Sequence, residues 1–357
     1  MRARYSLPAR GGIEAYWECA SEDAYAHVTT VGNRCRESQP TFQLLIACYV
    51  LSSAFTGSSI QRLLMAFKIQ PHTRIQEWVA LEKGYFNDEG LEYELEKSFI
   101  GVFRNPDLAG PSVPVTEMLK GAFEDMESGR ECDISSACHW AVNMASSAEH
   151  GRMWGHAYGV TPSGIWVPSE SDITSPEQLA GVEIAVGFHS GSHFSAMQSL
   201  ESYLSYDQIN LNFVGGAMDR MRLLLERRVP AGNVFGTASY VLEQQGFRKV
   251  IDTSFIVGFL IHNGANDSDA WKYFKALQRA QRDIDIAPEL YKHYLLDELP
   301  EKYRGMVDTR LCGIGERLVF EPYTKEMYEK THRWMVLHDL FPSGQQGKMQ
   351  YEVAVTA

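Results

Sequence analysis

Apolar positions along the chain follow two spacings in turn, and this predicts strands that alternate with helices. Residues 66–70 have the short apolar pattern of a strand. An amphipathic segment that begins at Trp78 predicts a helix, which we expect to end at Gly84 because glycine tolerates a left-handed C-cap. After Gly90, apolar and polar residues alternate over 91–95, as in a half-buried strand. The order strand, helix, strand is the unit of a parallel sheet.

The same alternation continues along the chain and predicts an α/β architecture. The predicted strands are at 132–136, 152–159, 164–168, 182–187, 209–214, 231–235 and 250–262. The predicted helices are at 114–129, 137–149, 191–204, 218–228, 237–245, 268–286, 288–299 and 323–338.

Composition and charge narrow the function classes. The chain has 357 residues, of which 45% are apolar and 22% charged, so it is long enough for two packed domains. A net charge of -12 argues against nucleic acid or an anionic membrane surface as the partner. Residues 1–64 hold six arginines and five acidic residues, whereas the remainder has a net charge of -13, so the composition changes near Met65.

The first 64 residues contain a ten-residue apolar segment, Phe42 to Leu51, which is shorter than the roughly 20 residues that a membrane span needs. The segment resembles the apolar part of a signal peptide, with Ser52-Ser53-Ala54 as a cleavage site, although about forty residues precede it. The alternative is a natural start at Met65. A signal at 42–54 implies a periplasmic or extracellular protein, and a start at Met65 a cytoplasmic one. In both cases we expect 1–64 to be an extension outside the fold.

The cysteines do not form a recognisable metal or disulfide pattern. The six residues are Cys19, Cys35, Cys48, Cys132, Cys138 and Cys312, and the chain has no CxxC and no Cys/His ligand spacing. We therefore expect free thiols and no metal site.

The segment from Trp78 to Glu94 contains, in order, Lys-Gly-Tyr-Phe, an acidic pair and Gly-Leu before the strand. This arrangement resembles the opening unit of type II periplasmic solute-binding proteins, in the nitrate/sulfonate/taurine-binding branch that includes the thiamin-pyrimidine synthases. Residues 175–181 are similar to the short helix that opens the second domain of those proteins. The resemblance implies two lobes, each a mainly parallel sheet flanked by helices, with a ligand cleft between them. It places lobe I at 65–159 plus 252–342, lobe II at 160–251, and a C-terminal tail at 343–357.

Open α/β sheets bind ligands beyond the carboxyl ends of their strands, so the strand-to-helix junctions are the candidate sites. The strongest candidate is the segment Gly187 to His193. Ser190 or Ser192 can cap the helix, Gly191 permits close approach, and the free N–H groups at a helix start favour an anion. His189 and His193 can add charge or hydrogen bonds near neutral pH. The alternative is a capped helix without a ligand.

A second candidate is the segment 135–140. The hydroxyls of Ser135 and Ser136 can donate to a carboxylate or sulfonate, and Trp140 can stack on an aromatic ligand. Cys138 and His139 are neighbours on a helix, where adjacent side chains point apart, so their adjacency does not make a nucleophile–base pair. The alternative is a buried cysteine and a capping serine.

Two further junctions are weaker candidates. After the first strand, His72 and Arg74 can bind a carboxylate, while an isolated arginine is more often a solvated surface residue. After the strand 231–235, a glycine permits backbone approach and a threonine caps the helix, which is equally typical of a plain helix start. The remaining predicted ligand-binding residues of these two junctions are Gln70, Thr73, Gly236 and Thr237.

Two functions are the main candidates for these residues, and an intracellular sensor or chaperone-like carrier of the same ligand is a third, weaker option. The first is a solute-binding protein that closes on a small organic anion (a sulfonate, carboxylate or related heterocycle), without a cofactor, and delivers it to a membrane permease. The second is an enzyme on the same scaffold, such as an aromatic-acid decarboxylase, a sulfinate desulfinase or a thiamin-pyrimidine synthase. Its catalytic candidates would be Cys138, His139, His189 and His193.

Synthase chemistry is not expected. In those enzymes the second junction carries the lysine that binds pyridoxal phosphate and a histidine that is consumed, whereas a loose alignment places Ala137 and Ala141 there. Their cysteine-rich segment is also replaced by residues 256–260. We favour binding over catalysis.

Overall fold

The computed structural model describes residues 66–72, 74–96, 121–128, 131–341 and 350–356. The proposed extension at 1–64, its apolar segment, Thr73 and the first part of the helix predicted at 114–129 lie outside these residues. Within the described ranges, no helix has the length and apolar character needed to cross a membrane.

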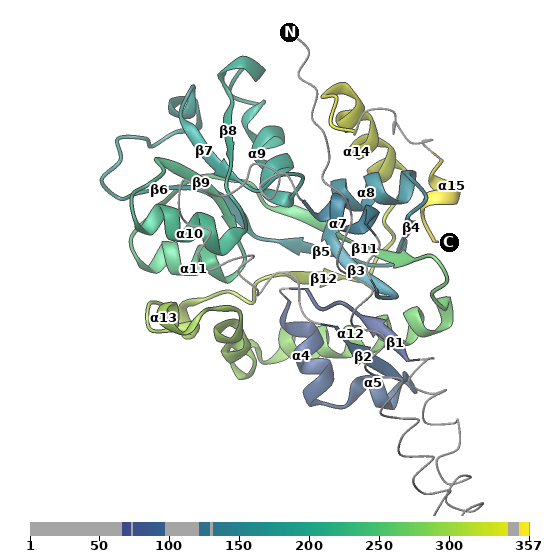
Figure 1. Ribbon diagram of the computed structural model, residues 1–357. Coiled ribbons are helices and arrows are strands. Elements are labelled where there is room, and N and C mark those ends of the chain that lie inside the picture. Colours follow the sequence, from purple (N-terminus) through teal and green to yellow (C-terminus); the bar gives the residue numbers. More distant parts are fainter. Residues whose placement is uncertain (1–65, 73, 97–120, 129–130, 342–349, 357) are drawn as a thin grey trace, which may run out of the picture. The chain divides into compact units, whose positions relative to one another are not determined.

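Sheet A has the strand order β12-β5-β11-β3-β1-β2, and β4 also pairs with β11 (Figure 1). The parallel part consists of β1 (Phe67–Ile69), which lies between β2 (Tyr93–Leu95) and β3 (Ile134–Cys138). The long strand β11 (Phe255–His262) is antiparallel to β3, to β4 (Gly151–Met153) and to β5 (Tyr158–Thr161). β12 (Arg317–Val319) completes the sheet beside β5.

Sheet B has the order β10-β6-β9-β7-β8. Its parallel part is β7 (Glu183–Val186) between β8 (Asn210–Phe213) and β9 (Ala231–Phe235). β6 (Ser163–Val167) and β10 (Arg248–Asp252) are the antiparallel strands.

Two extended segments supply strands to both sheets. Only Pro162 separates β5 in sheet A from β6 in sheet B, and only two residues separate β10 in sheet B from β11 in sheet A. The chain therefore passes between the sheets twice, and the expected two-lobed α/β fold is confirmed. The sheets are mixed rather than mainly parallel, because the two crossing segments run antiparallel to each other in both sheets.

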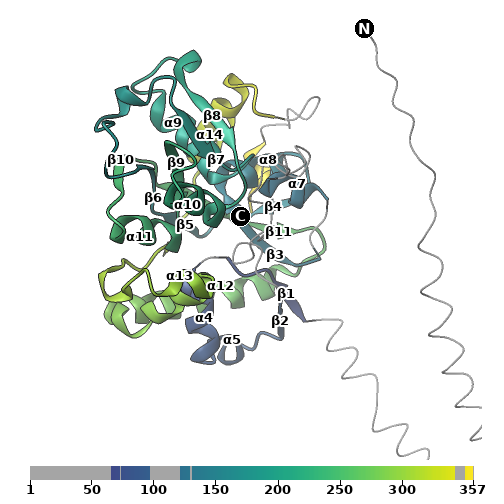
Figure 2. The ribbon, with the colours of Figure 1, turned by 60° about the vertical axis from the view of Figure 1, so that its left-hand side comes forward.

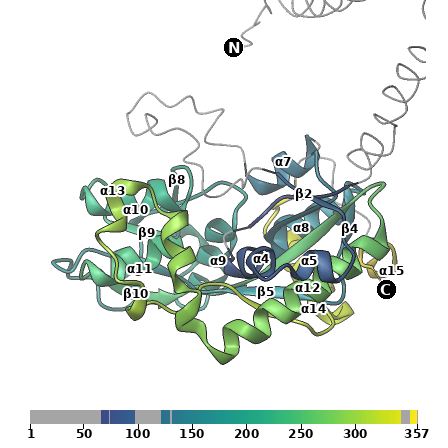
Figure 3. The same ribbon diagram turned by 90° about the horizontal axis from the view of Figure 1, so that it is seen from below.

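Helices cover both faces of sheet A. On one face α4 (Ile75–Glu82) and α5 (Tyr85–Asp88) pack against α12 (Asp267–Ile286), and Figure 3 brings these three helices to the front. The other face carries α7 (Ala122–Glu127), α8 (His139–Ser147), α14 (Lys325–Leu337) and α15 (Tyr351–Ala354). Residues 350–356 pack on β4, where the Thr356 amide donates to the Met153 carbonyl (2.8 Å).

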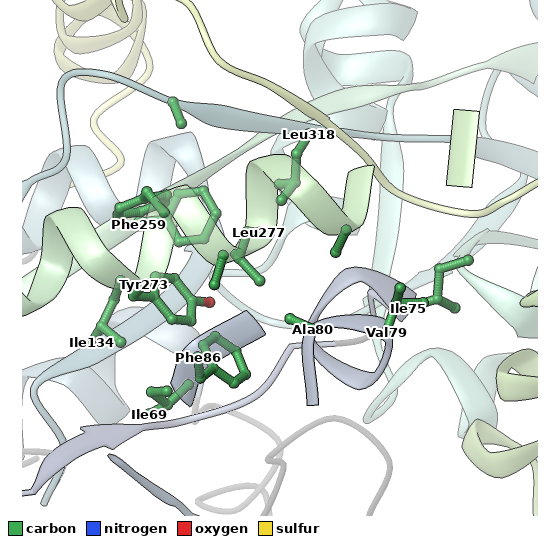
Figure 4. Packing of buried hydrophobic residues seen from close by; sticks show 14 of the residues in the cluster. Ile69, Ile75, Val79, Ala80, Phe86, Ile134, Phe259, Tyr273, Leu277 and Leu318 are labelled. Atoms are coloured by element: carbon green, nitrogen blue, oxygen red, sulfur yellow. The ribbon is translucent and has the colours of Figure 1, made fainter. Parts of the chain in front are cut away.

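The turn after α4 follows the sequence-based expectation. Gly84 has a φ of +71°, a left-handed conformation that suits a residue without Cβ. The following aromatic, Phe86, is fully buried and stacks on Tyr273 with 5.9 Å between ring centroids (Figure 4). Val79, Leu277 and their neighbours fill the same core, so the geometry of this turn serves packing.

Sheet B is covered by α10 (Ala217–Leu225) and α11 (Thr237–Gln244) on one face, where the two helices lie next to one another (Figure 2). On the other face lie α9 (Gly191–Leu200) and the 3-10 turn η2 (Pro176–Leu179); a second turn, η3 (Tyr206–Gln208), precedes β8. The segment predicted as a helix at 288–299 forms the 3-10 turns η4 (Pro288–Leu290) and η5 (Lys292–Glu298). It is followed by α13 (Glu301–Arg304) and η6 (Thr309–Leu311).

Candidate functional site

The junction between β7 and α9 is a tight loop held by its own serines. The Gly187 amide donates to Ser192 Oγ (2.9 Å), and Ser190 Oγ donates to the Gly187 carbonyl (2.8 Å). Ser190 occupies the N-cap position, but its hydroxyl caps no helix amide, so the predicted side-chain cap is absent. A Cβ on Gly191 would lie 2.3 Å from the ring of Phe255, which shows how closely the first turn of α9 approaches β11.

The two histidines of this junction have different surroundings. The ring of His193 is buried, and desolvation, with the nearby charge of His189, lowers its pKa to about 3. Nδ1 of His193 has no hydrogen-bond partner. Nδ1 of His189 pairs with the carboxylate of Glu124 on α7. Burial by itself would raise the pKa of Glu124, but the hydrogen bond and charge of His189 outweigh burial, and the pKa is lowered. His193 is therefore neutral and partly unsatisfied, whereas His189 is engaged by the protein itself.

The junction between β3 and α8 is largely buried. Ser135 Oγ lies 2.8 Å from His262 Nε2, and Ser136 is buried beside Phe259 of β11. Burial raises the pKa of the Cys138 thiol to about 12. Burial also lowers the pKa of His139 to about 3, and its Nδ1 lies 3.0 Å from the Tyr323 hydroxyl. Neither group is an activated nucleophile or a cation at neutral pH.

An aromatic cluster joins the starts of α8 and α9. The ring of Trp140 lies 5.7 Å from Phe194 and 6.2 Å from Phe255. His193 lies 4.9 Å from the same Phe194, and Phe235 at the end of β9 lies 5.5 Å from Phe255. Trp140 is buried, and its Nε1 has no hydrogen-bond partner. The structure thus brings the two strongest predicted junctions together, through phenylalanines that the sequence did not single out.

The predicted carboxylate-binding pair after β1 binds a carboxylate of the protein itself. His72 Nδ1 lies 2.9 Å from Glu316 Oε2, and Arg74 Nε donates to Glu316 Oε1 at 3.0 Å. Arg74 is fully buried, also pairs with Glu77, and lies 4.4 Å from the ring centroid of Phe259, so the interpretation as a solvated surface arginine is wrong. Desolvation opposes ionisation of Glu316, but the charges of Arg74 and His72 outweigh it and hold its pKa at about 2.

The junction after β9 meets a second buried carboxyl. Thr237 Oγ1 donates to Glu298 Oε2 (2.7 Å), while Glu298 Oε1 has no partner. Burial, and to a lesser extent the charge of Glu316, raise the pKa of Glu298 to about 8. A Cβ on Gly236 would meet no atom within 4 Å, so this glycine borders open space. Gln70 is partly exposed, and Thr73 lies outside the described residues.

Sequence reasoning missed Arg220, on α10. Its side chain is 1% exposed, yet it forms none of the ion pairs found among the described residues. Nε donates to the Asn233 carbonyl and Nη1 to the Gly215 carbonyl, both at 2.7 Å. Nη2 has no partner, and desolvation lowers the pKa of the guanidinium to about 10. The sequence could have indicated its burial: Arg220 and Leu224 are four positions apart, so they lie on the same side of the helix, and Leu224 is buried.

Two other kinds of site, a metal centre and a surface pocket, find little support in the described residues. Among the described residues, no group of three or more His, Cys, Asp or Glu side chains is arranged to hold a metal ion. A surface depression of about 380 Å³ lies between Pro168, Arg227 and Val229, away from every predicted site residue, and Arg227 there pairs with Glu170.

No protein-family model matches the sequence, and neither does any curated protein. Solved structures do match. The alkanesulfonate-binding protein SsuA from Xanthomonas axonopodis pv. citri, bound to MOPS, is 16% identical with a TM-score of 0.59, over 82% of this chain and 98% of that chain. The periplasmic aliphatic sulphonate binding protein SsuA from Escherichia coli is 14% identical with a TM-score of 0.58, over 81% and 91%. The desulfurization enzyme DSZB is 13% identical with a TM-score of 0.51, over 80% and 97%. The chain therefore has the SsuA-like, type II periplasmic-binding-protein fold.

Proposed function

We propose that this protein is a solute-binding protein that closes on a small organic anion between its two lobes. The observation that carries the proposal is a pair of buried ring nitrogens without partners at the aromatic cluster: Trp140 Nε1 on α8 and His193 Nδ1 on α9. Both rings lie against Phe194. An unsatisfied buried polar group costs about 1–3 kcal/mol, and a ligand that accepts from Trp140 Nε1–H and pairs with His193 Nδ1 would remove that cost.

The ligand class is inferred from two sources. The junctions at 135–140 and 187–193 offer ring nitrogens and helix-start amides suited to the oxygens of a sulfonate or carboxylate, whereas the hydroxyls of Ser135, Ser190 and Ser192 already have partners within the protein. The two SsuA proteins of the same fold are named for binding alkanesulfonates or aliphatic sulphonates. By analogy we infer that the lobes comprise 65–159 plus 252–342 and 160–251, and that a membrane permease receives the ligand.

The electrostatics of the candidate groups favour binding over catalysis. The Cys138 thiol has a pKa of about 12 and would have to lose its proton inside an apolar cluster to act as a nucleophile. His139 and His193, with pKa values of about 3, are weak bases at neutral pH. A decarboxylase or desulfinase would need better activated groups.

The test is a thermal-shift screen with alkanesulfonates, aromatic carboxylates and pyridoxal phosphate, followed by mass spectrometry of any hit. A true ligand stabilises the protein by an amount that grows with the logarithm of its concentration, about 2.7 kcal/mol at a hundredfold excess over Kd. We expect Trp140→Phe, which keeps the ring and removes Nε1–H, to weaken binding about tenfold. The matched control is Trp166→Phe, whose Nε1 is also unpaired but lies in the core of sheet B.

Equal affinity for both tryptophan variants would contradict the proposed position of the ligand. Conversion of the hit to a product by the pure protein would overturn the proposal of binding alone. A panel that leaves the unfolding temperature unchanged throughout would count against an organic anion as the ligand class.

A further inference from the structure

Arg220 is a buried cation that forms no direct ion pair within the described part of the chain; burial lowers its pKa and outweighs the nearby charge of Asp219, which favours the ionised form. Its two hydrogen-bonded nitrogens meet only backbone carbonyls, at Asn233 and Gly215. The neighbouring carboxylate of Asp219 has other partners: it accepts from the Gly216 amide (3.0 Å) and pairs with Arg222 (3.5 Å). A buried charge is costly unless it is paired and fully hydrogen-bonded. The unpartnered Nη2 and the lack of a direct ion pair among the described residues leave room for an anion here.

The guanidinium lies at the carboxyl end of β7, between the ends of the two strands that flank it. Gly215 follows β8 and Asn233 belongs to β9, so the two hydrogen bonds span the end of β7. A Cβ on Gly187 would lie 3.0 Å from Arg220 Nη1 and 3.0 Å from Ser190 Oγ. The arginine therefore borders the same loop that opens α9.

The first turn of α9 adds unpaired donors at this place. The amides of His193 and Phe194 donate to the Ser190 carbonyl, whereas those of Gly191 and Ser192 have no acceptor among the hydrogen bonds of the described residues. The positive end of the helix dipole and free N–H groups attract an anion. The ring of Phe235, 5.6 Å from the guanidinium, connects the site to Phe255 and Trp140.

We propose that Arg220 and the N-terminus of α9 together form the subsite for the charged end of the ligand, and that this end is an ionised oxyanion with several acceptor oxygens, such as a sulfonate. Only the identity of the ligand's organic part rests on the proposed function. A planar guanidinium with a free Nη2 and a helix N-terminus can each donate to different oxygens of one such group.

Inorganic sulfate probes the subsite without the organic part. We expect sulfate to raise the unfolding temperature of the wild type beyond the effect of sodium chloride at equal ionic strength, and the rise should grow logarithmically once sulfate exceeds a Kd on the order of millimolar. Arg220→Met should lose this sulfate-specific rise. Arg222→Met is the matched control, because it removes the same charge from the same helix. The Arg222 side chain pairs with Asp219, and this variant should keep the sulfate-specific rise in unfolding temperature.

Benzenesulfonate and the neutral benzenesulfonamide probe the same subsite with an organic part. The wild type should prefer the sulfonate at least tenfold, and Arg220→Met should lose this preference. If Arg220→Met does not fold, Arg220→Lys serves instead; it keeps the charge without the planar guanidinium and should bind benzenesulfonate about tenfold more weakly.

Wild type without saturable sulfate binding, or an Arg220 variant that binds sulfate as well as the wild type, would overturn the subsite. A hit from the ligand screen that binds wild type and Arg220→Met equally would also overturn it while leaving the proposed function intact. Sulfate binding that depends on Arg220, without any organic hit, would support the subsite and contradict the proposed function.

Discussion

Glu298 and Glu316 are two buried glutamates with opposite protonation states, and the substitution Glu298→Gln tests this difference. Burial raises the pKa of Glu298 to about 8, so at neutral pH its carboxyl group is mostly protonated. A glutamine has nearly the shape of a protonated glutamic acid and keeps an oxygen that accepts the hydrogen bond from Thr237. The substitution thus removes the titration of this group with little change in packing.

The magnitude follows from linkage. In the unfolded chain the carboxyl titrates near 4.5, whereas in the folded protein it titrates near 8. The folded state therefore binds the proton more tightly, and its stability falls as pH rises between these two values. Each pH unit in this window costs about 1.4 kcal/mol. Between pH 5 and pH 8 the wild type should lose about 4 kcal/mol through this group, and Glu298→Gln should not.

The assay is urea unfolding followed by tryptophan fluorescence at several pH values from 5 to 8. The variant and the wild type should be similar at pH 5, and the variant should be the more stable protein at pH 8. Parallel stability profiles for the two proteins would refute the reasoning, since they would mean that Glu298 is ionised or exposed in the folded state.

Glu316→Gln is the matched control with the opposite sign. Glu316 has a folded pKa of about 2, below its unfolded value of 4.5, so its contribution is present above pH 4.5 and is lost as pH falls toward 2. The same isosteric change should therefore cost about 3 kcal/mol at pH 7, because it leaves Arg74 and His72 without their shared carboxylate.

Three further predictions concern the candidate site. Gly191→Ala should destabilise the protein by about 1–3 kcal/mol, because the new Cβ would lie 2.3 Å from the ring of Phe255; an unchanged melting temperature would contradict this packing. Cys138 should resist iodoacetamide at pH 8 in the native protein and react in urea, because burial raises its pKa to about 12; peptide mapping measures both rates. Asn233→Ala should cost about 2–4 kcal/mol in urea unfolding, since this amide accepts from Ser163 and Thr253 and donates to Ser192; a loss below 1 kcal/mol would show that the three contacts are dispensable.

The sequence was sufficient to locate the strand-to-helix junctions. The spacing of apolar residues and the glycines at the ends of elements are local signals, so Gly84, the loop at 187–193 and the end of β9 were placed correctly. The sequence did not reveal that the sheets are mixed, because strand direction depends on which strands pair across the two crossings. The segment at 288–299 was also misassigned, since apolar spacing does not distinguish 3-10 turns from an α-helix.

What the sequence alone determined is the order of elements and the kinds of side chain that gather at the carboxyl ends of the strands. The tertiary structure decided which of them are free. His72 and Arg74 meet Glu316 more than 240 residues later in the chain, and Thr237 meets Glu298, so these predicted ligand groups are already occupied. Arg220, which no pattern singled out, lies against the loop of α9 with a nitrogen unpaired. The reason is physical: conformation follows from neighbours in the chain, whereas burial and the choice of a counter-charge depend on contacts that only the folded chain creates.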